Sequence, residues 1–175
     1  VEAAAREVDE TAQVVMQSEQ KGTAHAVDQA RAALKGFKGD VIVLYGDTPF
    51  VQPDTLDRMI AARAENDLVI LGFEAADPAR YGRLVMDGDQ LQEIVEYKDA
   101  TEAQRAITFC NSGLLACAAD RLFDLIAQVG NDNASGEYYL TDVVALARTA
   151  GLRVTAVACT EDQTLGVNSR ADLAA

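Results

Sequence analysis

An aspartate just beyond an apolar run is the residue of this chain best placed to do chemistry. The run covers residues 41–44 and leads through Tyr45 and Gly46 to Asp47, before Pro49 turns the chain. An unbroken apolar run of this kind predicts a buried parallel strand. Because ligands of open α/β sheets bind beyond the carboxyl ends of the strands, we expect Asp47 to lie where a metal ion or a phosphate binds. The first hypothesis is an enzyme that acts on nucleotides.

An amide near the end of the chain could share a metal ion with Asp47. Asn168 follows Gly166 and Val167. Carboxylate and amide oxygens suit Mg²⁺, which keeps several water molecules, takes few protein ligands and bridges substrate phosphates. We therefore expect Asp47 and Asn168 to hold Mg²⁺. In the alternative interpretation, Asp47 begins the turn before Pro49 and Asn168 caps the last helix.

A Gly-Thr pair and a nearby amide could recognise a nucleotide base. Gly22 and Thr23 precede an alanine-rich stretch and are expected to open a helix, whose first backbone N–H groups are free to bind a ligand. Gln17 offers a paired donor and acceptor that can read the edge of a base. The structural alternative is that Thr23 only caps its helix and that Gln17 is a solvated strand residue.

Polar residues at expected strand ends could bind the hydroxyl groups of a sugar. Glu96 would accept and Asn111 would donate hydrogen bonds, and Gly82 would allow a ligand to approach the backbone. The alternatives are a surface carboxylate for Glu96, a turn-forming role for Asn111 and a β-bulge at Gly82. The single His25 has no partner motif for nucleophilic catalysis, so we expect it to be structural.

The elements that must position these residues follow an α/β pattern. Strands are expected over residues 11–17, 41–47, 68–71, 107–116 and 152–159, and helices over 1–11, 23–34, 53–63, 120–129 and 139–149. Residues 83–86 and 91–97 flank Asp87-Gly88-Asp89, which predicts an antiparallel hairpin. The pattern predicts a Rossmann-like, mostly parallel mixed sheet that is flanked by helices and interrupted by an antiparallel hairpin excursion.

The composition argues against several classes of partner. The 175 residues, 49% of them apolar, fit one domain. The formal charge of −13 argues against nucleic acid and against an anionic membrane, but a cation would allow an anionic small molecule to bind. No apolar run approaches the roughly twenty residues of a membrane span. Cys110, Cys117 and Cys159 have no zinc or CxxC spacing, so we expect free thiols in or near the core of a cytoplasmic protein.

Six segments in this order resemble the uridyltransferase half of the bacterial bifunctional N-acetylglucosamine-1-phosphate uridyltransferase and glucosamine-1-phosphate acetyltransferase family. Any one of them is a weak motif, but six in register are specific. They cover the chain from Gln17 to about Arg170. The segments are QSEQKGTAHA at 17–26, YGDTP at 45–49, YGR at 81–83, IVEYKDA at 94–100, GEYYLTD at 136–142 and GVN at 166–168.

The resemblance implies a nucleotide-diphospho-sugar transferase fold and transfer of uridylyl from UTP to N-acetylglucosamine 1-phosphate. The products would be pyrophosphate and UDP-N-acetylglucosamine, a precursor of peptidoglycan and lipopolysaccharide. Gln17, Gly22 and Thr23 would contact uracil, and residues 45–47 would lie by the ribose and phosphates. Asp47 and Asn168 would hold Mg²⁺. The residues implied for the N-acetylglucosamine portion are Gly82, Glu96, Asn111, Tyr139 and Thr141.

The implied reaction is a direct in-line attack by a sugar-phosphate oxygen on the α-phosphorus of UTP. It needs no catalytic nucleophile or base, only positioning and charge neutralisation by the metal ion and by cations such as Arg83. The family's glycine-rich phosphate loop has no counterpart here, and the chain stops near Asp172, before the left-handed β-helix that carries acetyl transfer. We therefore expect residues 1–175 to form a partial uridyltransferase domain with an exposed sheet edge, inactive alone, from a homotrimeric parent.

Two other functions remain open. One is a related sugar-1-phosphate nucleotidyltransferase with another sugar or base, since a fold alone does not set the substrate. The other is a non-catalytic module that binds a sugar nucleotide. A dinucleotide oxidoreductase is set aside because no G-x-G-x-x-G follows any expected strand.

Overall fold

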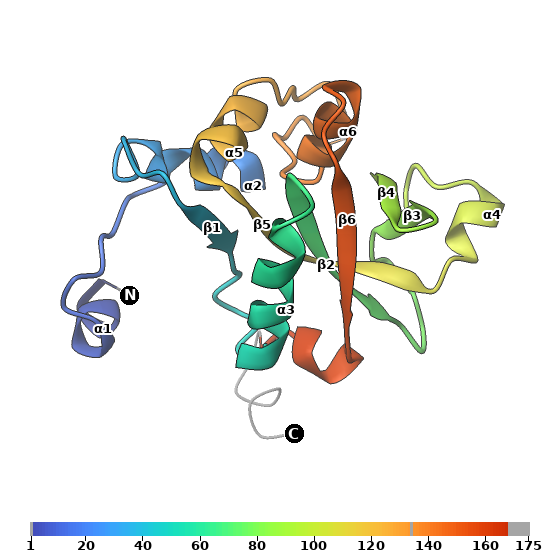
Figure 1. Ribbon diagram of the computed structural model, residues 1–175, viewed down its shortest axis with the longest axis horizontal. Coiled ribbons are helices and arrows are strands. Elements are labelled where there is room, and N and C mark those ends of the chain that lie inside the picture. The colour runs from blue at the N-terminus through green and yellow to red at the C-terminus, as the bar shows by residue number, and fades with distance from the viewer. Residues whose placement is uncertain (1, 134, 168–175) are drawn as a thin grey trace.

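The computed structural model describes residues 2–133 and 135–167, and a six-stranded mixed sheet forms the centre of that part (Figure 1). The strand order is β4-β3-β5-β2-β6, and β1 pairs with β5 off this path. The strands are β1 (Asp40–Val43), β2 (Leu68–Glu74), β3 (Arg83–Asp87), β4 (Gln90–Val95), β5 (Phe109–Ala118) and β6 (Val154–Cys159).

Strand β5 runs antiparallel between β1 and β2, so β1 and β2 point in the same direction. The pair β2–β6 is parallel, whereas β3 is antiparallel to both β4 and β5. The expected mixed sheet is confirmed, although most of its described pairs are antiparallel. The prediction of a buried parallel strand over residues 41–47 is wrong: β1 ends at Val43, is half-buried and pairs antiparallel with β5. An apolar run does not show which neighbour a strand will have.

The described helices lie on both faces of the sheet (Figure 1). They are α1 (Glu2–Val8), α2 (Thr23–Asp28), α3 (Pro53–Arg63), α4 (Glu102–Arg105), α5 (Ala119–Ile126) and α6 (Asp142–Thr149), with short 3₁₀ turns at Gln29–Arg31 and Glu161–Thr164. Helix α1 lies apart from the sheet and has no buried residue. Within the described part, no helix has the length and apolar character needed to cross a membrane.

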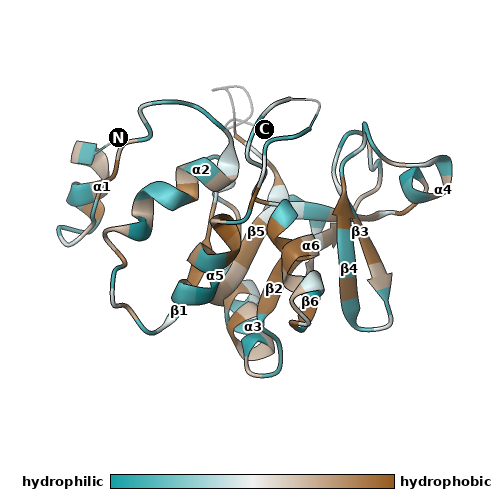
Figure 2. Cartoon of the chain, turned by 90° about the horizontal axis from the view of Figure 1, so that it is seen from above, coloured by the Kyte–Doolittle hydropathy of each residue, from teal (hydrophilic) through white to brown (hydrophobic). Residues whose placement is uncertain are grey.

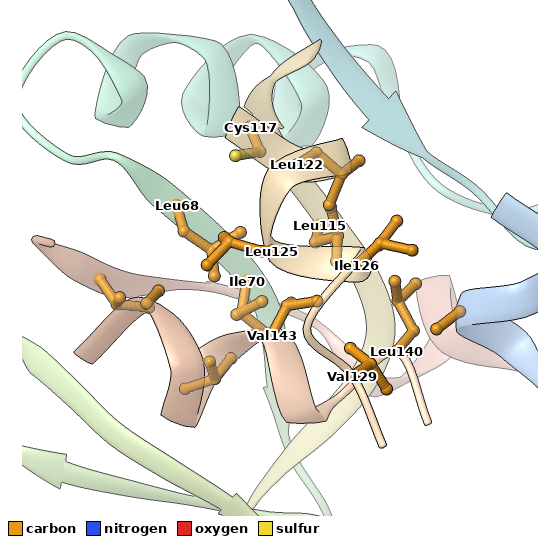
Figure 3. Close-up of a cluster of buried hydrophobic side chains, with 14 of the residues drawn as sticks. Leu68, Ile70, Leu115, Cys117, Leu122, Leu125, Ile126, Val129, Leu140 and Val143 are labelled. Atoms are coloured by element: carbon orange, nitrogen blue, oxygen red, sulfur yellow. The ribbon is translucent and has the colours of Figure 1, made fainter. Parts of the chain in front are cut away.

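Strand β2 separates two hydrophobic clusters because successive side chains of a strand point to opposite faces. Leu68 and Ile70 pack with α5 and α6 in the larger cluster, which is drawn in Figure 3. Val69 and Leu71 pack with Met59 of α3 on the other face. Both faces of the strand are therefore buried, as its continuous apolar run predicts. Figure 2 shows β2 as a hydrophobic strand beside helices of mixed hydropathy.

The hairpin expected around residues 87–89 is confirmed. Strands β3 and β4 pair antiparallel, and Gly88 at their turn has a φ of 56°, which favours glycine. Helix α4 follows β4 and was not predicted from the sequence. Its signal is a capping box in which Thr101 accepts from the N–H of Gln104 while the side chain of Gln104 accepts from the N–H of Thr101.

The strand expected over residues 11–17 is absent from the structure. Its apolar residues Val15 and Met16 are 44% and 79% exposed, and no strand pairs with this segment among the described residues. The three β-branched and apolar residues at 14–16 favour an extended chain, but a strand also needs a partner for its backbone groups. Alternation of residue types alone could not supply that partner.

Candidate active site

A cavity of about 660 Å³ opens where the end of β1, the amino end of β5 and the loops around the hairpin meet. Its volume is in the range of sites for small molecules. Seven of the residues singled out from the sequence line it. They are Thr23, Tyr45, Gly82, Glu96, Asn111, Tyr139 and Thr141.

A bulge in β5 directs Asn111 toward this cavity. Ile70 of β2 pairs with Leu115, but Gly72 pairs with Asn111, so extra residues of β5 loop out between these two points. The side-chain oxygen of Asn111 accepts a hydrogen bond of 3.0 Å from the N–H of Gly113. The amide nitrogen of Asn111, which has no protein partner in the described part, remains able to donate to a ligand.

The ring of Tyr45 packs against the glycine of this bulge. Gly113 has a φ of 90°, and a Cβ built on it would lie 2.2 Å from Cε2 of Tyr45. Burial raises the pKa of the Tyr45 phenol, and the carboxylates of Asp47 and Glu96 raise it further. The phenol therefore stays protonated at neutral pH and can donate a hydrogen bond within the cavity.

Gly82, Glu96 and Asn111 form a compact group on one wall. The N–H of Asn111 donates to the carbonyl oxygen of Gly82 at 2.8 Å, and a Cβ on Gly82 would lie 3.4 Å from Oε1 of Glu96. Burial raises the pKa of Glu96, with smaller contributions from Asp99 and Asp142. The three residues thus bring a carboxylate, an amide and bare backbone together, a set able to bind sugar hydroxyls.

The loop around Gly22 is joined to the loop that carries Tyr139 and Thr141. The N–H of Tyr138 donates to the carbonyl oxygen of Lys21 at 2.8 Å, and the N–H of Ala24 donates to the carbonyl oxygen of Tyr138 at 3.0 Å. Gly22 has a φ of 113°, and a Cβ on it would lie 2.5 Å from the carbonyl oxygen of Tyr138. Only glycine allows this close approach of the two backbones.

Thr23 does not cap helix α2, contrary to the structural alternative considered for it. The N-cap residue is Gly22, and the hydroxyl of Thr23 instead accepts a 2.9 Å hydrogen bond from the N–H of Leu140. A threonine can cap a helix only if its hydroxyl accepts from a backbone N–H of that helix. Here the buried N–H of Leu140 is the partner, so Thr23 connects two walls of the cavity.

Gln17 does not line the cavity, and its side-chain amide forms hydrogen bonds within the protein instead. Its Nε2 donates to the carbonyl oxygen of Gly22 at 3.1 Å and lies 3.0 Å from Nδ1 of His25. The half-buried His25 also lies 3.3 Å from the amide nitrogen of Gln29. His25 therefore has a side-chain amide beside each ring nitrogen, and its structural role stays a prediction.

Gly46 and Asp47 follow Tyr45 just outside the cavity lining. The N–H of Val167 donates to the carbonyl oxygen of Asp47 at 2.7 Å, which brings residue 167 beside the exposed Asp47. Asn168, the other expected metal ligand, lies outside the described residues. Within the described ranges, no group of three or more His, Cys, Asp and Glu side chains could hold a metal ion.

The remaining lining residues were not singled out as ligands from the sequence. They are Arg80, Tyr81, Tyr97, Lys98, Asp99, Ser112, Gly113 and Glu137. Their signal was their position, since each lies within three residues of a predicted ligand in the sequence. Arg83, expected to supply positive charge near the phosphates, does not line the cavity. It is 2% exposed, and its guanidinium donates to backbone carbonyls.

Comparisons with known proteins agree with this fold. The model of the MobA-like NTP transferase domain family matches residues 2–145. The chain is 77% identical over 175 residues to "Bifunctional protein GlmU" of Ruegeria pomeroyi and 61% identical over 172 residues to that of Cereibacter sphaeroides. It covers 100% and 98% of itself in these matches, but spans only 39% and 38% of the length of those relatives.

Solved structures of low sequence identity share the fold. A nucleoside-diphosphate-sugar pyrophosphorylase from Vibrio cholerae matches with a TM-score of 0.65 and 16% identity, over 91% of this chain and 66% of that one. A UDP-glucose pyrophosphorylase complexed with UDP-glucose matches with a TM-score of 0.59 and 16% identity, over 82% and 57%. The sheet, its flanking helices and the matched residues 2–145 lead to one conclusion: the chain belongs to the MobA-like NTP transferase domain family.

Proposed function

We propose that this chain is the sugar-binding and metal-binding part of an enzyme that transfers uridylyl from UTP to N-acetylglucosamine 1-phosphate. The products are UDP-N-acetylglucosamine and pyrophosphate. The observation that carries this proposal is one cavity that is lined by six residues of five separate motifs, together with Asn111. Residues 23 and 141 are far apart in sequence, yet both line this cavity, and the hydroxyl of Thr23 accepts from the N–H of Leu140, next to Thr141.

The sugar lies in this proposal against Gly82, Glu96 and Asn111. The carboxylate of Glu96 accepts from sugar hydroxyls, and the amide nitrogen of Asn111 donates to them. Tyr139 and Thr141 approach from the opposite loop. A site that pairs each hydroxyl rejects analogues that lack one, because its own polar groups would then be left without partners.

Asp47 and Asn168 hold Mg²⁺ in this proposal. One carboxylate and one amide oxygen fit an ion that keeps most of its ligands as water and substrate phosphate. The hydrogen bond from Val167 to Asp47 supports the pairing, since it brings the residue before Asn168 next to Asp47. When bound, the ion would offset the negative charge of the phosphates in a chain of net charge −13.

The residues of the chain act by positioning the substrates, with no covalent intermediate. Gly82, Glu96 and Asn111 orient the sugar so that its phosphate oxygen faces the α-phosphorus of UTP. In-line displacement then needs no side-chain nucleophile. Gly22 and Thr23 would contact uracil, and hydrogen bonds join their loop to the loop of Tyr139 and Thr141, which approach the sugar. Gln17, whose amide nitrogen is already bonded, would read uracil through its side-chain oxygen.

The whole protein that contains this domain is also part of the proposal. The relatives named "Bifunctional protein GlmU" are longer than this chain, which spans 39% of the Ruegeria pomeroyi protein. We infer that residues 1–175 belong to a uridyltransferase domain of a cytoplasmic protein for cell-envelope precursor synthesis. Acetyl transfer and trimer formation would belong to other parts of that protein.

Binding and turnover test this proposal separately. We expect UDP-N-acetylglucosamine with Mg²⁺ to shift the NMR signals of residues 82, 96 and 111, and Glu96→Ala to abolish these shifts. Glu65→Ala, which changes an exposed carboxylate outside the cavity, should leave them unchanged. A ligand that shifts no cavity residue would contradict the site.

A pyrophosphate-release assay with a panel of sugar phosphates then tests the reaction. We expect the longer protein to prefer UTP with N-acetylglucosamine 1-phosphate, and the 175-residue chain to show little turnover because no glycine-rich phosphate loop is present in it. Preference for another sugar or nucleotide would favour a related nucleotidyltransferase. Binding without turnover by the longer protein would indicate a sugar-nucleotide binding module.

A further inference from the structure

Arg83 is a buried cation whose partners are backbone carbonyls. Its side chain is 2% exposed. Nη1 donates to the carbonyl oxygens of Pro78, at 3.2 Å, and of Tyr81, and Nη2 donates to that of Ala79 at 3.2 Å. No carboxylate is within ion-pair distance of Arg83 in the described part of the chain. A buried charge without a counter-ion depends on these hydrogen bonds to offset its desolvation.

The guanidinium also contacts the segment that follows β4. Nε and Nη2 each lie 3.4 Å from the carbonyl oxygen of Arg105, at the end of α4. The guanidinium carbon lies 5.9 Å from the ring centroid of Tyr97. Arg105 holds the same tyrosine, with its own guanidinium carbon 4.7 Å from the ring and its Nε 3.2 Å from the carbonyl oxygen of Tyr97. These are cation–π distances.

The two segments that Arg83 joins are the ones that bear the sugar-side residues. Residues 78–81 lead into Gly82, and Tyr97 follows Glu96 directly. The first segment also contains Ala79 with a φ of 39°, a conformation that a residue other than glycine adopts only when its surroundings hold it. The carbonyl of that strained residue is one of the acceptors of Arg83.

We propose that Arg83 is a positioning residue that sets the distance between Gly82 and Glu96, and through it the fit of the sugar. This inference rests on the proposed function for the identity of the ligand. Arg83 does not touch the substrate. It acts by holding residues 78–81 and 96–97 in one arrangement, with five donors in a rigid plane that can reach two segments at once.

The variants Arg83→Met and Arg83→Lys test this role, with Arg63→Met as the matched control. Arg63 is also a largely buried arginine, 11% exposed, but it pairs with Asp40 at the start of β1, at the end of that strand away from Tyr45. Lysine keeps the charge but cannot donate to both segments in a plane. We therefore expect Arg83→Met to disturb the two segments most and Arg83→Lys to disturb them less.

The first measurement needs no ligand. Amide hydrogen exchange in the folded variants should show lost protection at Asp99 and Ala100, whose N–H groups donate to the backbone carbonyl oxygen of Glu96. Protection should also fall at Tyr81 and Asn111, whose N–H groups donate to the carbonyl oxygens of Pro78 and Gly82. Protection in β2 and β6 should not change. Arg63→Met should leave the four amides protected. Equal loss of protection throughout the sheet of Arg83→Met would show a role in global stability and would overturn the inference.

The second measurement is the affinity for N-acetylglucosamine 1-phosphate by NMR titration. We expect Arg83→Met to lose about tenfold to a hundredfold, Arg83→Lys to lose less and Arg63→Met to match wild type. Unchanged affinity of a folded Arg83→Met chain would overturn the inference. If wild type itself does not bind the sugar phosphate, the proposed function fails, and the exchange measurement alone decides whether Arg83 holds the two segments.

Discussion

The ring of Tyr45 occupies the space that any side chain on Gly113 would need, since a Cβ there would lie 2.2 Å from Cε2 of Tyr45. We therefore expect Gly113→Ala to displace the ring and to strain a backbone with a φ of 90°. Overpacking of this kind costs about 1–3 kcal/mol of unfolding free energy. Urea unfolding measures this loss, and an NMR titration with the sugar nucleotide should show weaker binding.

Gly130→Ala is the control for Gly113→Ala. Gly130 has no atom within 4 Å of a built Cβ and no left-handed φ. It should therefore keep the stability and ligand affinity of wild type. A Gly113→Ala chain that unfolds at the same urea concentration as Gly130→Ala would show that Tyr45 does not depend on the bulge.

Thr23→Val should destabilise the chain and weaken sugar binding together. The substitution keeps the shape of the side chain but leaves the buried N–H of Leu140 without its acceptor. An unpaired buried donor costs about 1–3 kcal/mol. Thr23→Ser keeps the hydroxyl and should stay close to wild type in both measurements. A loss for serine with none for valine would mean that the methyl group, and not the hydrogen bond, holds the loop of Tyr139.

Gly82→Ala should weaken binding of N-acetylglucosamine 1-phosphate by about tenfold, or about 1.4 kcal/mol. The added Cβ would lie 3.2 Å from Cγ2 of Ile94 and 3.4 Å from Oε1 of Glu96, so the carboxylate must move. Gly130→Ala adds the same methyl group where nothing lies within 4 Å, away from the cavity, and it should not affect the sugar phosphate. Titration of both variants measures the difference. Identical sugar-phosphate affinities would contradict a ligand that lies against Gly82.

Glu96→Gln should stabilise the chain at neutral pH and abolish sugar binding. Burial, Asp99 and Asp142 raise the pKa of Glu96 above 4.5, so the folded chain binds its proton more tightly than the unfolded chain does. The contribution of Glu96 to the free energy of unfolding is therefore fully present below pH 4.5, and it is lost as pH rises through the raised pKa. The advantage of glutamine should appear above that pKa and vanish toward pH 4.5.

Thermal unfolding midpoints of Glu96→Gln and wild type across this range measure the effect. Glu93→Gln, an exposed carboxylate of β4 three residues before Glu96, is the matched control for loss of a negative charge. A gain of equal size and pH dependence in Glu93→Gln would show that net charge, not the burial of Glu96, is responsible.

The thiols should differ in their reaction with iodoacetamide in the folded chain. Burial raises the pKa of Cys117 to about 12, and burial also raises those of Cys110 and Cys159. Cys110 and Cys117 are fully buried, whereas Cys159 is half-buried. We expect Cys159 to react first, and the other two to react only after unfolding. Mass spectrometry of the labelled chain identifies the order, and early labelling of Cys117 would contradict the packing of β5.

The sequence alone determined the elements whose signals are local. The apolar run of β2 predicts burial on both faces, Pro53 predicts the start of α3, and Asp87-Gly88-Asp89 predicts the hairpin. Each of these depends on backbone preferences and side-chain periodicity within a few residues. The ordered motifs also pointed to the residues that line the cavity, although their binding roles remain predictions.

Only the tertiary structure determined which strands pair and which side chains bond to which backbone groups. The strand β1 could not be placed beside β5 from its own residues, and Arg83 was expected near phosphates but holds carbonyls of two loops. Thr23 had the local chemistry of a helix cap, yet its hydroxyl accepts from Leu140, 117 residues away. Such pairings follow from which buried groups need a partner once the chain is packed, and that competition has no signature within a short stretch of sequence.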